Sequence, residues 1–346
     1  MKSLIQKLAD GRHLDQNEWV ALIAGDYDDQ LLFDQAVAVR QRVYGRDVYI
    51  RGLIELSNFC ANDCYYCGIR CSNALAERYR LTEEDILARC EAGYALGFRT
   101  FVLQGGEDGR DRDDYLIPLI RKIKAQWPDC ALTLSLGERS RESYQALYDA
   151  GANRYLLRHE TANAEHYARL HPPFQRFEER IRCIKDLLEI GFQTGSGFMV
   201  GSPFQTPEYL AQDMLLLEEL QPQMVGIGPF IPHHQTPFAE YPAGSLELSL
   251  RMVALSRLLL PQALIPATTA LATLDPQGRE RGILAGANVV MPNLSPADVR
   301  KKYLLYDNKA CTGLEAAEAL DNLRNSMAAI GYQVVTDRGD WKKPTE

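Results

Sequence analysis

From Val48 onward, short apolar runs alternate along the chain with longer amphipathic stretches. Short apolar runs are typical of buried strands, and apolar residues at helical spacing are typical of helices packed on a sheet. The runs predict strands at Val48–Leu56, Thr100–Leu103, Ala131–Leu136, Arg154–Leu157, Gly195–Val200, Met224–Ile227, Ala263–Thr268 and Ala287–Met291. The stretches between them predict helices at Glu83–Leu96, Tyr115–Ala125, Arg141–Ala150, Phe177–Ile190, Pro207–Leu220, Leu246–Leu260 and Gly278–Ala285.

This alternation predicts an α/β fold, a parallel (β/α)8 TIM barrel. Glycines follow several of the predicted helices, as they do at helix C-termini. An open doubly wound sheet is the alternative, although no GxGxxG turn follows a strand. Residues 1–47 predict an N-terminal helical lead-in, residues 48–295 the barrel, and residues 296–346 a C-terminal helical extension with a helix near Leu314–Ile330. No low-complexity linker divides the chain, so we expect a single domain.

Composition narrows the choice of partners. The net charge of −8 and the pI near 5.4 argue against nucleic acid or an anionic membrane as the main partner. Charges interrupt the first residues before an apolar signal core can form, and no stretch reaches the roughly 18 apolar residues of a membrane span. We therefore expect a soluble, cytoplasmic protein.

Four of the eight cysteines lie within twelve residues, directly after the first predicted strand. Cys60, Cys64 and Cys67 have CxxxCxxC spacing, and thiolates suit the soft irons of an iron–sulfur cluster. Three ligands leave one iron of a 4Fe–4S cluster open to a substrate or cofactor. A zinc loop is the alternative, but the second Cys or His pair that zinc normally needs is not evident. A thiolate from Cys71 would fill the open corner, so we interpret Cys71 as a bystander.

Polar residues also follow the next strands, and in (β/α)8 enzymes the chemistry lies at these C-terminal strand ends. Strand two ends in residues 104–108 (QGGED), where glycines admit a ligand and a carboxylate can take an ammonium group. Strand three ends near Ser135 and Glu138, and strand four in residues 158–160 (RHE). Carboxylates there can accept ribose hydroxyls, and Arg180 can bind a carboxylate. The histidine of RHE is more often structural than a base.

Further candidates point to an anion. Thr268 and Thr269 end strand seven, where hydroxyls and amides can form an anion nest, although threonine is also an ordinary strand residue. Arg51 and Arg154 lie within predicted strands. If they point into the barrel, their charges need an anionic ligand or a carboxylate. Glu55 lies four residues after Arg51 on the same predicted strand, so the two side chains should point to the same face. Glu55 is therefore the alternative partner of Arg51 within the protein.

Together these segments resemble the radical S-adenosylmethionine (SAM) enzymes and, among them, the HydE family of FeFe-hydrogenase maturases. The runs that carry the resemblance cover most of residues 48–311 and are IRGLIELSNFCANDCYYCGIR, RYRLTEEDI, LQGGED, LTLSLGE, GANRYLLRHETAN, MVGIGPFIPH, TPF, LIPATTA and GANVVMPN. Methylornithine synthase is the nearest sister family and biotin synthase a more distant one. Both remain alternative functions, and a non-catalytic iron–sulfur scaffold is an alternative of another class.

The resemblance implies that SAM binds the open iron and is cleaved reductively to a 5′-deoxyadenosyl radical. The residues implied for SAM are Tyr66, Gly105, Gly106, Glu107, Ser135, Glu160 and Arg180. Those implied for the substrate cavity are Arg51, Gln104, Arg154, Met224, Thr268, Thr269 and Tyr303, with Tyr306 in contact with the reacting species. The implied substrate is a small iron–cysteine complex for the di-iron subcluster of the hydrogenase. The implied partners are other hydrogenase maturation proteins and an electron donor such as a flavodoxin or ferredoxin.

One feature of the family is missing. Some HydE proteins bind a second cluster near the C-terminus through three cysteines. Here Cys311 occupies the first position, but Ala319 and Asn322 occupy the others. We therefore expect no second cluster.

The cysteine spacing generates the first prediction. Replacing Cys60, Cys64 and Cys67 together with alanine should abolish cluster binding, because no other three thiols are close in sequence. Cys71→Ala is the matched control and should keep cluster content and SAM cleavage nearly intact. Iron and sulfide analysis with EPR after anaerobic reconstitution measures both. A full cluster in the triple variant would show that the ligands lie elsewhere.

Overall fold

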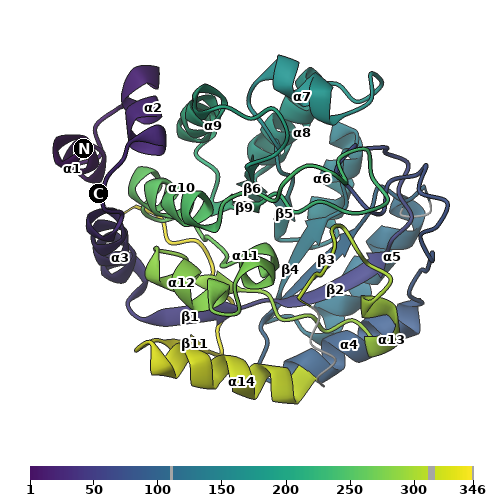
Figure 1. Cartoon of the computed structure of the whole chain (residues 1–346). Coiled ribbons are helices and arrows are strands. Elements are labelled where there is room, and N and C mark those ends of the chain that lie inside the picture. The colour runs from purple at the N-terminus through teal and green to yellow at the C-terminus, as the bar shows by residue number, and fades with distance from the viewer. Residues whose placement is uncertain (110–111, 311–315, 345–346) are drawn as a thin grey trace.

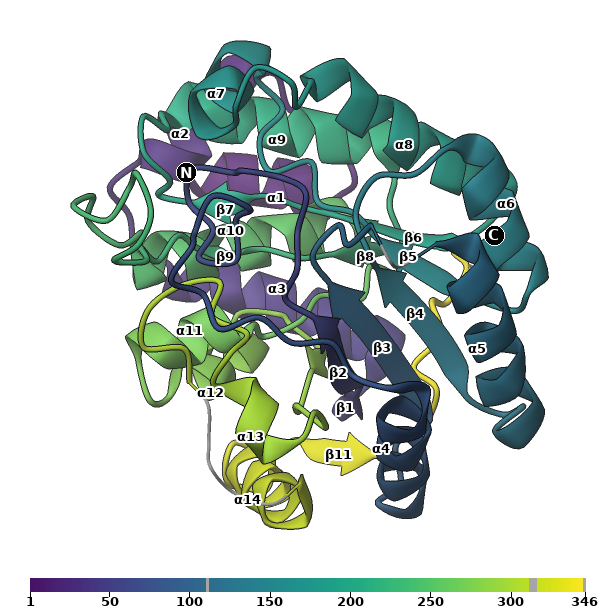
Figure 2. The same ribbon diagram turned by 90° about the vertical axis from the view of Figure 1, so that its right-hand side faces the viewer.

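The computed structural model describes residues 1–109, 112–310 and 316–344, and its strands form a closed parallel barrel (Figures 1 and 2). One six-stranded parallel sheet has the order β2-β3-β4-β5-β6-β8. These strands are β2 (Gly52–Ser57), β3 (Thr100–Gly105), β4 (Ala131–Ser135), β5 (Arg154–Leu156), β6 (Gln193–Ser196) and β8 (Met224–Val225). Short parallel bridges continue from β8 through Leu264 and Pro266 to β10 (Val289–Val290), which pairs with β1 (Asp47–Ile50). The predicted (β/α)8 barrel is confirmed.

Three predicted strands are interrupted, each for a local reason. Strand one divides at Arg51, because β1 pairs with β10 and β11 whereas β2 pairs with β3. Strand five divides into β6 and β7 (Met199–Val200) at Gly197, where a Cβ would lie 2.0 Å from the carbonyl oxygen of Gly226. Strand seven forms only single bridges around Pro266, which has no N–H to donate.

Helices surround the strands as the pattern predicts (Figure 2). The ring comprises α4 (Glu83–Ala95), α5 (Asp113–Gln126), α6 (Arg141–Asp149), α8 (Phe177–Ile190), α9 (Pro207–Leu220), α10 (Leu246–Leu259) and α12 (Gly278–Leu284). Local signals begin several of them: Thr82 and Asp85 form a capping box on α4, and Thr206 caps α9 before its N1 proline. No helix in the described ranges is long and apolar enough to cross a membrane.

Other helices extend the barrel. The lead-in consists of α1 (Lys2–Ala9), α2 (Gln16–Ala24) and α3 (Gln30–Tyr44), with α2 packed on α9 and α3 on α10 (Figure 1). The short helices α7 (Ala164–Leu170), α11 (Thr269–Leu274) and α13 (Ala297–Arg300) were not predicted. The predicted C-terminal helix is α14 (Ala316–Ala329). Cys311 lies outside the described residues.

The C-terminal tail contributes an unpredicted strand and covers the N-terminal mouth of the barrel. Strand β11 (Gln333–Val335) pairs in parallel with β1, and the chain then crosses the first residues of several strands. Thr100, which begins β3, donates to the carbonyl of Arg338 at 2.7 Å. The backbone N–H of Trp341 donates to the side chain of Gln193, which begins β6, at 3.2 Å.

Arg154, which begins β5, belongs to this tail contact. Its side chain is fully buried, and Nη2 donates to the carbonyls of Arg338 and Gly339 at 2.9 and 3.2 Å and to Asp340 Oδ1 at 2.7 Å. The anionic partner of Arg154 is therefore part of the protein itself. No free substrate is needed to balance this buried cation.

Arg154→Met should consequently act on stability. Removing the guanidinium leaves buried tail carbonyls without a donor, which should lower the free energy of unfolding by about 2 kcal/mol. Arg141→Met is the matched control, because Arg141 pairs at the surface with Asp186 and Glu189 and should matter little. Urea unfolding monitored by circular dichroism measures both. Unchanged stability with loss of enzymatic function would instead place Arg154 in a substrate site.

Candidate active site

The cysteine loop leaves β2 and is held in place by three distant parts of the chain. The backbone N–H groups of Ala61, Tyr65 and Gly68 donate to the carbonyls of Glu107, Leu170 and Leu305 at 3.0 Å or less. Because these bonds lie among the three cysteines, they fix the loop around Cys60, Cys64 and Cys67.

The three thiols are free, partly buried, and line a cavity of about 380 Å³. Burial raises their pKa values, that of Cys64 to about 12, since a thiolate loses hydration there. Bound iron supplies the positive charge that keeps buried thiolates ionised, so this donor set fits a cluster. Cys71 is exposed and is not among the described lining residues.

The cavity brings together most of the residues predicted from the sequence, at the C-terminal ends of the strands. It is lined by Tyr66, Gly105, Gly106, Glu107, Ser135, Glu160 and Arg180, and also by Gln104, Thr268, Thr269, Tyr303 and Tyr306. Gly106 has to be glycine, because a Cβ would lie 2.3 Å from the carbonyl oxygen of Phe59 and 2.7 Å from Cys60 Cβ. The turn after β3 therefore packs directly on the cysteine loop.

Three of the residues predicted for the substrate cavity are not among its described lining residues: Arg51, Arg154 and Met224. Arg51 lies below it, where Nη1 contacts Met224 Sδ at 3.0 Å and burial lowers the arginine pKa. Within the described chain, Arg51 Nε and Nη2 have no hydrogen-bond partner. The suggested partner, Glu55, instead pairs with Lys309 Nζ at 2.5 Å. Arg51 is therefore buried without a carboxylate partner among the described residues, and its predicted role in substrate binding stays a prediction.

Arg158 lines the cavity; the sequence places it at the polar end of strand four but does not predict it as a site residue. It lies on β5's extension, four residues beyond Arg154 and so about 13 Å further along the strand direction. Its Nε and Nη2 donate to the two oxygens of Glu160 at 3.1 and 2.6 Å. Although burial opposes ionisation, Arg158 holds the pKa of Glu160 below its usual value.

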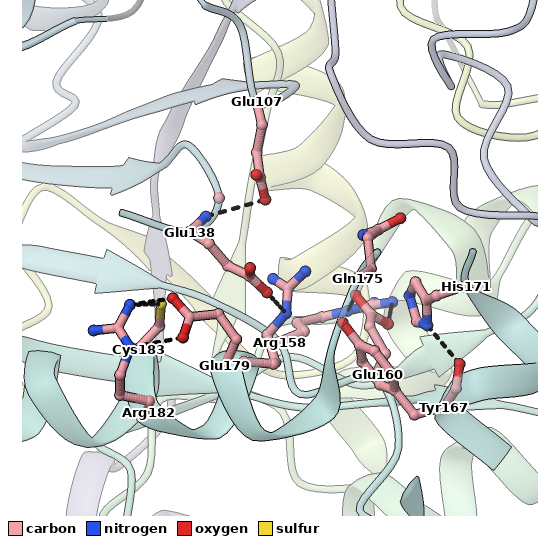
Figure 3. Close-up of polar contacts among 12 residues, drawn as sticks. Glu107, Glu138, Arg158, Glu160, Tyr167, His171, Gln175, Glu179, Arg182 and Cys183 are labelled. Atoms are coloured by element: carbon pink, nitrogen blue, oxygen red, sulfur yellow. Dashed lines mark hydrogen bonds and ion pairs between the residues drawn. The ribbon is translucent and has the colours of Figure 1, made fainter. Parts of the chain in front are cut away.

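Glu107, Glu138 and Arg180 form a second charged group, in which Glu107 and Arg180 line the cavity. Figure 3 shows Glu107 beside the backbone of Glu138. The backbone N–H of Glu138 donates to Glu107 Oε1 at 3.0 Å, and the Glu138 carboxylate lies 2.8 Å from Arg180 Nε. Burial raises the pKa of Glu138. The group presents one guanidinium and the Glu107 carboxylate to the cavity, which suits a ligand that carries both charges.

Tyr66, from the cysteine loop, is held by a neutral histidine. Its hydroxyl lies 3.1 Å from His171 Nε2, and His171 Nδ1 lies 2.9 Å from the carbonyl oxygen of Tyr167. Since a carbonyl only accepts, Nδ1 carries the proton and Nε2 accepts from Tyr66. Burial lowers the pKa of His171 to about 4, in agreement with a neutral ring.

The C-terminal extension also lines the cavity, through Tyr303, Leu305, Tyr306 and Lys309. Gln104 Nε2 donates to the Tyr303 hydroxyl at 3.3 Å, and Lys309 Nζ donates to the Tyr303 carbonyl at 3.0 Å. Thr268 Oγ1 is buried and, among the residues described, has no hydrogen-bond partner, so it is available to a ligand. Lys309 was missed by sequence reasoning because an isolated lysine in a polar tail carries no positional signal.

One other group has metal-ligand spacing among the described residues: His233, His234 and Asp307. The backbone N–H of Gln235 donates to His233 Nδ1 at 3.1 Å, so the neutral ring carries its proton on Nε2. His234 Nδ1 already contacts Asp307 at 2.7 Å. A metal on His233 Nε2 would require that proton to leave, and hydrogen bonding alone accounts for the cluster.

Comparison with known proteins agrees with this site. A profile of the Radical SAM superfamily matches residues 54–217. The FeFe hydrogenase maturase subunit HydE of Thermotoga maritima is 43% identical over 318 residues, 92% of this chain and 90% of that protein. The 3-methylornithine synthase of Methanosarcina acetivorans is 28% identical over 297 residues, 85% and 83% of the two chains. The structure of methylornithine synthase (PylB) has a TM-score of 0.81 at 23% identity, covering 96% and 97%, and shows the same fold.

The barrel, the three-cysteine loop and these matches define a radical SAM enzyme, so a 4Fe–4S cluster and SAM are its cofactors. The alternative of a non-catalytic scaffold is thereby set aside. Within this class, the chain belongs to the HydE family, with methylornithine and biotin synthases as sister families. The predicted resemblance is confirmed.

Gly137 offers a test of the cofactor end. Its φ is +75°, and a Cβ would lie 2.0 Å from Glu107 Cγ, so Gly137→Ala should displace Glu107 and weaken SAM binding by at least about tenfold. Gly11→Ala is the matched control, with φ +72° and open space around its Cβ. It should cost some stability and leave SAM affinity unchanged. Calorimetric titration of the cluster-loaded proteins compares them, and equal affinities would place Glu107 outside the SAM site.

Proposed function

We propose that this enzyme acts on an iron-bound cysteine during assembly of the di-iron subcluster of FeFe hydrogenase. The observation that carries the proposal is one cavity lined both by the three cysteines and by polar residues such as Gln104, Thr268 and Lys309. The 43% identity to a FeFe hydrogenase maturase subunit supports the same conclusion. The cavity lies within the barrel and is partly covered by the C-terminal extension, which would limit the access of solvent to a reactive radical.

The cofactor end divides the recognition of SAM among several elements. Cys60, Cys64 and Cys67 would hold the cluster, and reduction of SAM on its open iron supplies a 5′-deoxyadenosyl radical. Glu107 would take the methionyl ammonium group, with Gly105, Gly106 and Ser135 giving the backbone close access. Arg180, buried beside Glu138, would take the carboxylate. Glu160 would accept the ribose hydroxyls, and Tyr66 would lie along the adenine.

The substrate end suits a small anionic complex. Thr268 offers a free hydroxyl, Thr269 begins α11, and Gln104 adds an amide. Arg158 and Lys309 are cations that line the cavity, and each is balanced by a carboxylate, Glu160 for Arg158 and Glu55 for Lys309. We assign the anion-binding role first given to Arg154 to Arg158, which lines the cavity.

The tyrosines and the deeper residues complete the substrate assignment. Burial raises the pKa of Tyr306 to about 12, so its neutral phenol would contact the reacting species. Tyr303 would help to close the cavity. Arg51 and Met224 lie beneath it and would act only if the substrate reached deeper.

Partners follow from this role. Electrons would come from a carrier such as a flavodoxin or ferredoxin, and the substrate from another maturation protein. A methylornithine-synthase-like reaction is the second candidate, because the PylB barrel superposes over nearly the whole chain. Products distinguish the two: methylornithine synthesis would rearrange a free amino acid, whereas a maturase should give active hydrogenase.

Thr268→Val tests the substrate end, since valine keeps the shape and removes the hydroxyl. It should spare uncoupled SAM cleavage, because the thiols and the SAM residues are unchanged. Hydrogenase maturation should fall at least about tenfold, the cost of an unpaired buried group on the substrate. The measurements are 5′-deoxyadenosine release and hydrogenase activity after in vitro maturation.

Thr206→Val is the control at a threonine that caps α9 outside the cavity, and it should leave maturation nearly unchanged. Normal maturation by Thr268→Val would move the substrate site elsewhere in the cavity. If the wild-type chain cleaves SAM but never yields active hydrogenase, the maturase proposal itself fails.

A further inference from the structure

A buried Ser–His–Asp arrangement lies behind the cavity wall, under the Arg158–Glu160 pair. His159, between those two residues, is fully buried, and its Nδ1 lies 2.9 Å from Ser196 Oγ at the end of β6. Its Nε2 lies 3.3 Å from Asp213 Oδ1, at the long end for a hydrogen bond. Asp213 comes from α9, so three separate elements meet at one imidazole.

The geometry orients the protons of this group. His159 Nε2 faces the Asp213 carboxylate at 3.3 Å but has no hydrogen-bond partner among the described residues. With the Nε2 proton turned toward this carboxylate, Ser196 donates to Nδ1. This order resembles a hydrolytic triad. However, Ser196, His159 and Asp213 are all fully buried and none lines the described cavity, so no substrate reaches the hydroxyl.

Asp213 is costly to bury and is incompletely paired. Its Oδ1 accepts from the N–H of Ala162 at 2.5 Å as well as facing His159. Its Oδ2 has no hydrogen-bond partner within the described residues. A buried carboxylate with one unpaired oxygen makes the fold less stable than an apolar side chain would. Such a cost is expected at a position where the carboxylate orients a functional group.

The group that it can orient is Glu160. Glu160 has φ +66°, a left-handed conformation that costs a non-glycine residue of order 1 kcal/mol or more. Its N–H donates to the carbonyl of Gly197 at 3.0 Å, directly after Ser196. The hydrogen bond from the Ala162 N–H to Asp213 therefore holds the backbone after Glu160. Before Glu160, the His159 side chain is bonded to Ser196 and packs 3.3 Å from Asp213.

We propose that Asp213 and Ser196, acting through His159, are positioning residues that aim the Glu160 carboxylate at the SAM ribose. The inference rests on the proposed role of Glu160 and deepens it. On this proposal, the selectivity for a ribose with free hydroxyls depends on the Ser196, His159 and Asp213 group, which we call the relay. The relay lies behind the cavity wall and does not line the cavity. A carboxylate accepts two adjacent hydroxyls only when both oxygens face them, so a small rotation loses one bond.

The test compares the binding of SAM and of its 2′-deoxyribose analogue to the oxidised, cluster-loaded enzyme by calorimetry. Wild type should prefer SAM by about tenfold, the value of one hydrogen bond to a charged group. His159→Phe keeps the ring beside Phe198 and removes both nitrogens, so the preference should fall to nearly one. Asp213→Asn keeps the shape and removes the charge, and should lower the preference by at least about threefold.

The controls separate three explanations. Ser256→Ala removes a buried hydroxyl that contacts Met214, the neighbour of Asp213, and should keep the wild-type preference even if stability falls. Glu160→Gln should lose the preference. If it does not, the proposed role of Glu160 is wrong. If Glu160→Gln loses the preference while His159→Phe retains it, the relay is only structural and this inference is overturned. Should His159→Phe fail to fold, Asp213→Asn decides by the same criterion.

Discussion

The hydrogen bonds that close the barrel between strand one and strand eight are the constraint on which the rest of the structure depends. The N–H groups of Tyr49, Arg51 and Leu53 donate to the carbonyls of residues 288, 290 and 292 at 2.9–3.0 Å. Closure places the C-terminal ends of all the strands around one axis. The cysteine loop after β2 therefore faces residues 268 and 269 across a shared cavity, although they are far apart in sequence.

Closure also places charges inside the barrel, and most of them are paired. Arg158 has Glu160, Arg180 has Glu138, and Lys309 has Glu55. Pairing offsets the desolvation cost of these cations in a low-dielectric interior. Their N–H groups that are not used in the pairs stay available to ligands. The same arrangement, a guanidinium or ammonium group held by a carboxylate, thus recurs at three points of the interior.

The C-terminal extension serves both ends of the barrel. Its first part brings Tyr303, Tyr306 and Lys309 to the cavity. Its last part adds β11 beside β1 and covers the opposite mouth, where Asp340 pairs with Arg154. The barrel therefore has two polar mouths. At the covered mouth the Asp340 carboxylate contributes to stability, and at the other mouth the strand ends line the cavity, where barrel enzymes carry out their chemistry.

The sequence by itself determined the features that depend on local spacing. The barrel, most helix limits, the three-cysteine loop and the polar strand ends follow from periodicity and from residues adjacent in the chain. Tertiary structure decided what depends on depth and on distant partners. Alternation along a strand predicts that Arg154 and Arg158 share a face, but not which of them reaches the ligand. Lys309, the tail over Arg154 and the relay behind Glu160 join segments far apart in sequence, and only the closed barrel brings those segments into contact.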